Sequence, residues 1–321
     1  MIQHLSIILF FPLSFADDQL LFVISLWRTG IHAPVNEGIA LDRKYFPYGY
    51  GQLTELGINQ TYNVGRFLRS RYIDEIPLLS PILNVHELYL QSTDTAACIS
   101  SAQTVGQGMY NADGREIPLP LPVHTSPRYN DWLLAFDWRN CPSLSRFFHK
   151  TCASFPLISQ IHSQSEYDKL ILRCANATKE ATFFVDEEDY EKMEYLITEM
   201  HRYQRGVGEF FNAIILRLST GRLIDTIQRE MLHKWKCIQK KRPQCNTIRN
   251  VKFRAFSTDE SVIDSLLDIL GIRNVCLGDS FSSPSYNSLI LIELWQKDSL
   301  PSVKIFYRPD SFSSPIEVTS H

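Results

Sequence analysis

The stretch Leu20-Leu-Phe-Val-Ile-Ser-Leu-Trp-Arg-Thr-Gly-Ile-His-Ala-Pro34 decides how this chain folds. Its first seven residues, Leu20 to Leu26, form an apolar run of strand length, which is typical of a strand buried on both faces of a sheet. A turn at Arg28-Thr29-Gly30 follows directly. Ligands of open α/β sheets bind at the carboxyl ends of the strands, so this turn is the first place to expect a functional site.

Helix and strand patterns alternate in the segments that follow. Thr54 is expected to cap a helix, because its side chain can accept a hydrogen bond from the first turn. A short strand is predicted over Glu87–Leu90, and a helix over Ala96–Met109 with Thr93 or Asp94 as its cap.

Between about residues 130 and 250 the long strand runs vanish and helical patterns dominate. Alternating structure then returns over Val251–Phe256 (strand), Glu260–Leu270 (helix), and Leu289–Trp295 with Val303–Tyr307 (a hairpin). Strands on both sides of a helical insert predict an α/β core over 17–130 and 250–321, interrupted by a helical cap over 131–249.

The N-terminus has the layout of a secretory signal peptide over residues 1–16. Leu5–Ala16 is apolar but too short to span a bilayer, and it ends in Ser14-Phe15-Ala16 before two acidic residues. A buried first strand is the alternative, and the acidic residues that follow disfavour it. No later segment holds 18 consecutive apolar residues, so we expect a secreted or lysosomal protein without a membrane anchor.

The charge balance argues against a general nucleic-acid or membrane binder. The chain has 32 Lys and Arg against 35 Asp and Glu, a formal charge of −3. Binders of nucleic acids or anionic membranes use clustered basic surfaces. The short run Lys240-Lys241-Arg242 is expected to be a solvated loop.

In an oxidising compartment the cysteines are first of all candidates for disulfides. The chain has seven: Cys98, Cys141, Cys152, Cys174, Cys237, Cys245 and Cys276. No pair has CxxC spacing, so no metal site is expected. Cys237 and Cys245 can close a local loop, and Cys98, at a buried helix start, is the expected free thiol. Asn59 and Asn176 open two glycosylation sequons.

Five ordered segments together resemble the histidine acid phosphatases, a branch of the phosphoglycerate-mutase-like superfamily. They are Leu26–Pro34, Tyr48–Gly57, Gln91–Asp94 with Ser101-Ala102 downstream, Leu121–Thr125, and Phe256–Ser261. The resemblance implies a three-layer α/β core with a central mixed sheet and an inserted α-helical cap. It also implies hydrolysis of phosphate monoesters at acidic pH, with no cofactor.

The first family motif is only partly retained. It reads Arg-His-Gly-x-Arg-x-Pro, in which the histidine attacks phosphorus and both arginines bind phosphate. Arg28, Gly30 and Pro34 match this motif, whereas Thr29 stands at the nucleophile position and His32 at the second arginine.

The two later motifs depart further from the family pattern. Gln91 stands where the family has a third phosphate-binding arginine. Asp259 and Glu260 stand where the family has a phosphate-binding histidine and an aspartic acid that donates a proton.

These substitutions weaken the expected chemistry. A threonine hydroxyl needs an adjacent base to become a nucleophile, and His32, three residues along a turn, is the one candidate for a rescue. Each lost charged hydrogen bond costs about 1.5–3 kcal/mol of phosphate binding. Because buried charges are normally paired, Arg28 is expected to pair with Asp259 or Glu260.

We therefore expect a secreted acid-phosphatase-like protein with little or no activity. One alternative is an active acid phosphatase that uses His32 or a water as nucleophile and Glu260 as acid. Another is an extracellular interaction protein that uses the cap surface. A small phosphorylated ligand is not expected, and a homodimer or an extracellular protein is the expected kind of partner.

The resemblance also bears on the remaining cysteines. Cys141 resembles a family cysteine that pairs with a tail beyond this chain, and Cys152 is close enough in sequence to replace that partner. Cys174 resembles another paired position, for which Cys276 is the alternative partner.

Overall fold

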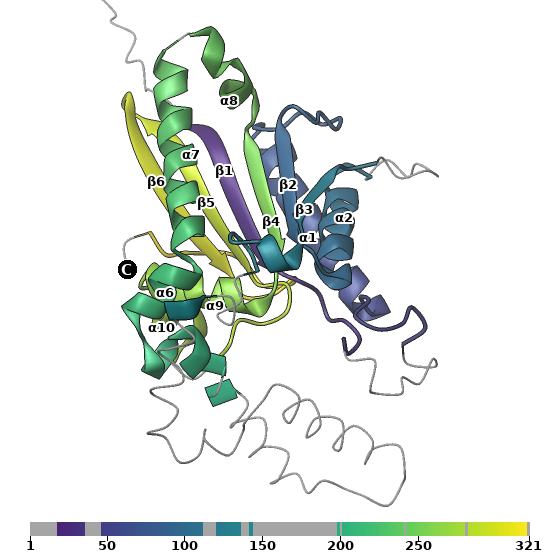
Figure 1. Ribbon diagram of the computed structural model, residues 1–321. Helices are drawn as coiled ribbons and strands as arrows, with labels where there is room; N and C mark the ends of the chain where they lie inside the picture. The colour runs from purple at the N-terminus through teal and green to yellow at the C-terminus, as the bar shows by residue number, and fades with distance from the viewer. Residues whose placement is uncertain are drawn as a thin grey trace, which may run out of the picture.

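A mixed seven-stranded sheet lies at the centre of the computed structural model, in the order β3-β2-β4-β1-β5-β6-β7 (Figure 1). The structure describes residues 18–35, 46–111, 120–135, 141–143, 198–199, 201–240, 242–279 and 282–319. The strands are β1 (Gln19–Arg28), β2 (Leu88–Thr93), β3 (Val123–Ser126), β4 (Phe253–Thr258), β5 (Leu289–Lys297), β6 (Leu300–Arg308) and β7 (Ile316–Glu317).

Helices cover both faces of this sheet. The described helices are α1 (Glu55–Arg69), continued by a π-helical turn (Ser70–Glu75), α2 (Ala96–Tyr110), α6 (Ala213–Ser219), α7 (Gly221–Gln239), α8 (Asn246–Asn250), α9 (Glu260–Ile269) and α10 (Arg273–Leu277). Residues 201–205 are helical as well. One apolar cluster joins α1 and α2 to the sheet, and a second joins α7 and α9 to it. The expected three-layer α/β core with a mixed sheet is thus confirmed.

Strand β1 is central because its side chains fill both apolar clusters. Ile24 and Leu26 point into the α7–α9 layer, whereas Val23 and Trp27 point into the α1–α2 layer. Side chains alternate between the faces of a strand, so an unbroken apolar run serves a strand covered on both sides. β1 pairs in parallel with β4 and antiparallel with β5.

The two helix starts illustrate one correct and one wrong prediction. Thr54 caps α1, accepting a hydrogen bond of 3.0 Å from the Gly57 N–H, as expected. The cap of α2 is Thr95, which accepts from the Cys98 N–H at 3.2 Å, and not Thr93 or Asp94. Thr93 still belongs to β2, and its hydroxyl bonds that of Thr258 on the neighbouring strand.

Helix α7 lies within the range that we expected for the cap, yet it packs on the sheet (Figure 1). Its buried side chains Leu223, Ile227 and Met231 recur every four residues, so they form one stripe facing the α7–α9 layer. The core therefore takes part of the range 131–249. Residues 144–197 of the expected cap lie outside the described residues.

One of the expected disulfides is present and two are not. Cys237 and Cys245 are bonded, and Cys98 is a free buried thiol, both as predicted. Cys141 and Cys276 are also free, which corrects the pairings considered with Cys152 and Cys174. Cys276 is buried in the apolar α7–α9 layer.

The other features expected of a secreted protein lie at exposed positions or outside the described residues. Asn59 is exposed on α1, where an acceptor for a glycan must lie, and its glycosylation stays a prediction. Asn176, Cys152, Cys174 and residues 1–16 lie outside the described residues. None of the helices in the described ranges is long and apolar enough to cross a membrane.

Candidate functional site

The candidate site lies where the parallel strands β1, β4 and β2 end. In the sheet Arg28 is paired with Thr258, and the Thr29 N–H donates to the Thr258 carbonyl at 2.8 Å. This register places the Arg28-Thr29-Gly30 turn beside Asp259 and Glu260. Gln91 lies two residues before the end of β2, paired with Phe256, and is buried.

Helix α1 holds the turn after β1 in place. The Ile31 carbonyl accepts from the Thr54 N–H at 2.9 Å. A Cβ atom on Gly57 would lie 2.0 Å from the Ile31 carbonyl oxygen, and one on Gly30 would lie 2.4 Å from the Thr61 hydroxyl. Both positions therefore need glycine because of close backbone approach, and the turn has little freedom to move.

Thr29, at the nucleophile position, is buried with 3% of its surface exposed. Its hydroxyl has no hydrogen-bond partner among the residues that the structure describes. A threonine attacks only when a base within hydrogen-bond reach takes its proton. No described side chain supplies that base.

His32 is packed against an aromatic ring that sequence reasoning missed. Its ring meets Tyr286 edge-on, with centroids 6.0 Å apart, and its Nδ1 lies 2.9 Å from the Ala33 carbonyl oxygen. Because a carbonyl only accepts, Nδ1 carries a proton. The Tyr286 ring also makes a cation–π contact with Arg28, whose guanidinium lies 4.0 Å from the ring centre.

Glu260 is held between two arginines. Its carboxylate lies 2.9 Å from Arg28 and 3.2 Å from Arg205. Arg28 also donates to the Pro284 carbonyl. The predicted pairing of Arg28 with Asp259 or Glu260 is thus resolved in favour of Glu260. Arg205, from a segment expected in the cap, was missed because nothing near it in sequence signals this contact.

The pKa of Glu260 follows from these contacts. Burial alone would raise it, but the charges of Arg28 and Arg205, with the hydrogen bond from Arg205, together lower it below the ordinary value. The side chain is therefore a carboxylate at any moderately acidic pH. A general acid must carry a proton near its working pH, and Glu260 does not meet that condition.

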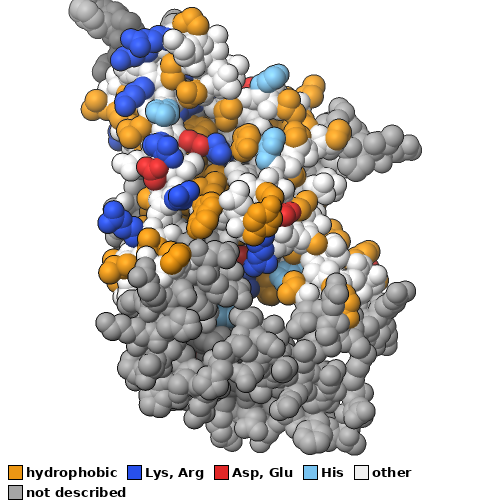
Figure 2. Space-filling model, in the orientation of Figure 1, with side chains coloured by type: hydrophobic (Ala, Val, Ile, Leu, Met, Phe, Trp, Pro, Cys, Tyr) orange, Lys and Arg blue, Asp and Glu red, His pale blue; other side chains and the backbone are white. Residues whose placement is uncertain are grey.

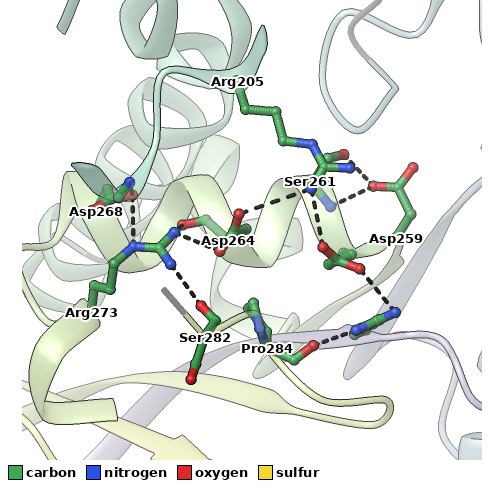
Figure 3. Close-up of polar contacts among 11 residues, drawn as sticks. Arg205, Asp259, Ser261, Asp264, Asp268, Arg273, Ser282 and Pro284 are labelled. Atoms are coloured by element: carbon green, nitrogen blue, oxygen red, sulfur yellow. Dashed lines mark hydrogen bonds and ion pairs between the residues drawn. The ribbon is translucent and has the colours of Figure 1, made fainter. Parts of the chain in front are cut away.

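The charge pairs continue away from the site along α9 (Figure 3). Arg205 lies 3.9 Å from Asp264, which in turn lies 2.5 Å from Arg273. Arg273 also pairs with Asp268 at 2.9 Å, and Asp268 accepts from the Gly208 N–H. Alternating charges thus tie residues 201–208 to helix α9.

Asp259, at the family's phosphate-binding histidine, serves as the N-cap of α9. Its side chain accepts from the Ser261 N–H at 3.1 Å and from the Ser261 hydroxyl. The pKa of Asp131 is raised chiefly by burial and further by the negative charges of Asp259 and Asp94. Burial, then the charge of Arg205, lowers the pKa of His201 to about 4.

These groups decide what the site attracts. Both arginines are already paired with Glu260, His201 is neutral above about pH 4, and carboxylates gather beside β4. A phosphate dianion would meet repulsion with few free cations to offset it. In the described residues no group of three side chains could hold a metal ion.

The fold and the site at the strand ends define a chain of the phosphoglycerate-mutase-like class. A family model described as "Histidine phosphatase superfamily (branch 2)" matches residues 12–151. The chain is 29% identical over 320 residues to "Putative acid phosphatase 1" of Caenorhabditis briggsae, covering 92% of this chain and 73% of that protein. It is 26% identical to "Lysosomal acid phosphatase" of Xenopus laevis, covering 99% and 76%.

A further relative is similar over half of the chain, and a solved structure shares the fold. "Prostatic acid phosphatase" of Homo sapiens is 31% identical over 170 residues, covering 50% of this chain and 43% of that one. The multiple inositol polyphosphate phosphatase of Bifidobacterium longum, solved with inositol hexasulfate, has a TM-score of 0.55 at 10% identity, covering 94% and 87%. Residues 12–151 thus match the histidine phosphatase superfamily (branch 2), and over nearly its whole length the chain is similar to acid phosphatases.

Proposed function

We propose that this chain is a secreted acid-phosphatase-like protein with little or no phosphomonoesterase activity. The observation that carries the proposal is the Thr29 hydroxyl, which is buried at the nucleophile position, with no base in hydrogen-bond contact among the residues that the structure describes. Phosphoryl transfer to a side chain needs a nucleophile that is both aimed and activated.

The state of Glu260 supports the same proposal. A leaving alcohol must receive a proton, and a carboxylate held between Arg28 and Arg205 has none to give at the pH of acid phosphatases. The Cys237–Cys245 disulfide and the names of the lysosomal and prostatic relatives support passage through the secretory pathway.

Hydrolysis of p-nitrophenyl phosphate between pH 4 and 8 tests the proposal. The full chain, secreted from a eukaryotic host, is compared with Thr29→Val and His32→Ala variants and with a mock preparation. Thr29→Val keeps the shape of the side chain and removes its hydroxyl. We expect four indistinguishable rates. A wild-type rate that exceeds the mock preparation and is lost in either variant would show an active phosphatase and identify its nucleophile.

A gain-of-function variant tests whether the residue correspondences are right. Thr29→His, His32→Arg, Gln91→Arg, Asp259→His and Glu260→Asp are combined in one chain. We expect measurable turnover, since the scaffold around the turn is retained. A variant that melts cooperatively but shows no activity would count against the correspondences themselves.

A further inference from the structure

Positive charge is concentrated in one part of the chain. The 28 residues from Met231 to Thr258 contain eight Lys and Arg and no Asp or Glu. The rest of the chain keeps 24 Lys and Arg against 35 Asp and Glu, a formal charge of −11. Although the net charge is only −3, positive and negative charge are concentrated in different parts of the chain, and the basic part can attract a polyanion locally.

The structure arranges part of this segment as a row along α7. Arg229, His233, Lys236 and Lys240 are exposed and recur at intervals of four, three and four residues, and Arg242 follows them. We call these five residues the α7 basic row. Its helical part extends about 16 Å. Figure 2 shows Lys and Arg side chains over α7, with His and acidic side chains among them.

The cations near α7 are of two kinds. Lys252 and Arg254 are paired with Glu87 and Glu230, so they serve the fold. Within the α7 basic row, Arg229 pairs with Asp225 at 2.9 Å, a contact that is exposed to solvent. Lys236, Lys240 and Arg242 make no ion pair with a carboxylate in the described ranges. Unpaired cations in a row cost energy through mutual repulsion, which a bound polyanion would relieve.

Covalent and polar contacts hold the end of the row in place. The Cys237–Cys245 disulfide joins the last turn of α7 to the segment before α8. Buried Lys234 donates to the Ile248, Arg249 and Val251 carbonyls, at 3.1, 2.7 and 2.6 Å. A preorganised backbone loses less entropy when a ligand binds.

We propose that the α7 basic row binds a linear sulfated polysaccharide of the heparan sulfate kind. A lipid bilayer fits less well, because the apolar face of α7 that would insert is buried on the sheet at Leu223, Ile227 and Met231. A nucleic acid fits less well, because the disulfide inside this surface belongs to an oxidising compartment.

The row lies away from the phosphatase-like site. The segment after α8 enters the sheet at the amino end of β4, where the Val23 N–H, at the middle of β1, donates to the Lys252 carbonyl at 3.0 Å. Thr29 follows the opposite, carboxyl end of the ten-residue β1. Binding at the row therefore leaves the site uncovered and does not depend on its chemistry.

The test measures binding of the full chain to a size-defined heparin octasaccharide in 0.05 to 0.3 M NaCl, about the physiological range and either side of it. The variant carries Lys236→Gln, Lys240→Gln and Arg242→Gln. We expect wild-type binding at about 0.15 M salt. We expect the variant to lose about tenfold or more in affinity. The slope of log K against log[salt] should become shallower by the equivalent of about two to three ionic contacts.

A second triple variant controls for net charge alone. Arg66→Gln, Arg128→Gln and Arg217→Gln remove three exposed cations that lie on other elements. This control should bind like the wild type. Equal losses in both variants, no heparin binding by the wild type at about 0.15 M salt, or binding only to phosphatidylserine vesicles or to DNA would each overturn the proposal.

Discussion

Replacing Glu260 by Gln tests the central electrostatic feature of the site. The change keeps the size of the side chain and removes the charge that bridges Arg28 and Arg205. Arg28, 14% exposed, then has no carboxylate partner in the described residues, and Arg205, 23% exposed, keeps only Asp264 at 3.9 Å. We therefore expect the variant to be less stable than the wild type at neutral pH.

The size of the loss follows from the exposure of the pairs. Hydrogen bonds to charged groups contribute about 1.5–3 kcal/mol when sheltered, and fully exposed ion pairs about 0.2–1 kcal/mol. The Glu260 side chain is 26% exposed, which places each pair between these limits. Gln still accepts one neutral hydrogen bond. We expect a total loss of about 2–3 kcal/mol, or about 3–5 °C in Tm for a chain of this length.

The loss should depend on pH in a defined direction. The pKa of Glu260 is lower in the folded chain than in the unfolded one. Its contribution to the free energy of unfolding is therefore complete above the unfolded value of about 4.3, and it disappears as the pH falls through the lower, folded value. The Tm difference between wild type and variant should be constant from pH 7 to 5.5 and narrow below about pH 4.

Differential scanning fluorimetry from pH 7 to 3.5 measures this difference, with Glu55→Gln as the matched control. Glu55 and Glu260 are both the first residues of capped helices, so the control subtracts the loss of a helix-dipole contact. A Glu260→Gln variant that matches this control at pH 7, or a difference that widens with acid, would refute the reasoning.

Two further predictions concern the turn and the thiols. Gly57→Ala should lower the free energy of unfolding by about 1–3 kcal/mol or more, because the added Cβ would clash with the Ile31 carbonyl. Gly221→Ala, whose Cβ would lie 3.7 Å from the nearest atom, should have little effect. Urea titration of both variants measures the difference. Burial raises the pKa of the Cys98 and Cys276 thiols to about 12. After alkylation at about pH 8, peptide mapping should therefore find both cysteines labelled only in denaturant. Labelling in the folded chain would contradict their burial.

The sequence was informative wherever the deciding signal is local. The apolar run of β1, the Thr54 cap and the Cys237–Cys245 loop each depend on residues within a few positions of one another, and all three are confirmed. The prediction of Thr93 or Asp94 as the cap of α2 was wrong, because the cap depends on where β2 ends, and the structure has Thr95 there. The end of β2 is set by pairing with its neighbours, since Ser92 pairs with β4 and Thr93 with Ser126 of β3, and no local pattern reports these contacts.

The parts of the site that were missed come from distant segments. Arg205 reaches Glu260 from 55 positions away, and Tyr286 packs on Arg28 from a loop before β5. An isolated arginine and a loop tyrosine carry no periodicity, so only the fold brings them to the site. The same holds for α7, whose stripe of Leu223, Ile227 and Met231 predicts an apolar partner without saying which one.

The position of β1 at the middle of the sheet has a consequence for biosynthesis. Its two neighbours, β4 and β5, begin at Phe253 and Leu289, so an emerging chain presents β1 long before either partner exists. An apolar strand with two unpaired edges is prone to pair with other chains. Most of the chain must therefore be synthesised before β1 is paired on both edges. During that interval we expect the emerging chain to associate with chaperones, and truncated products that lack β4 and β5 to be retained.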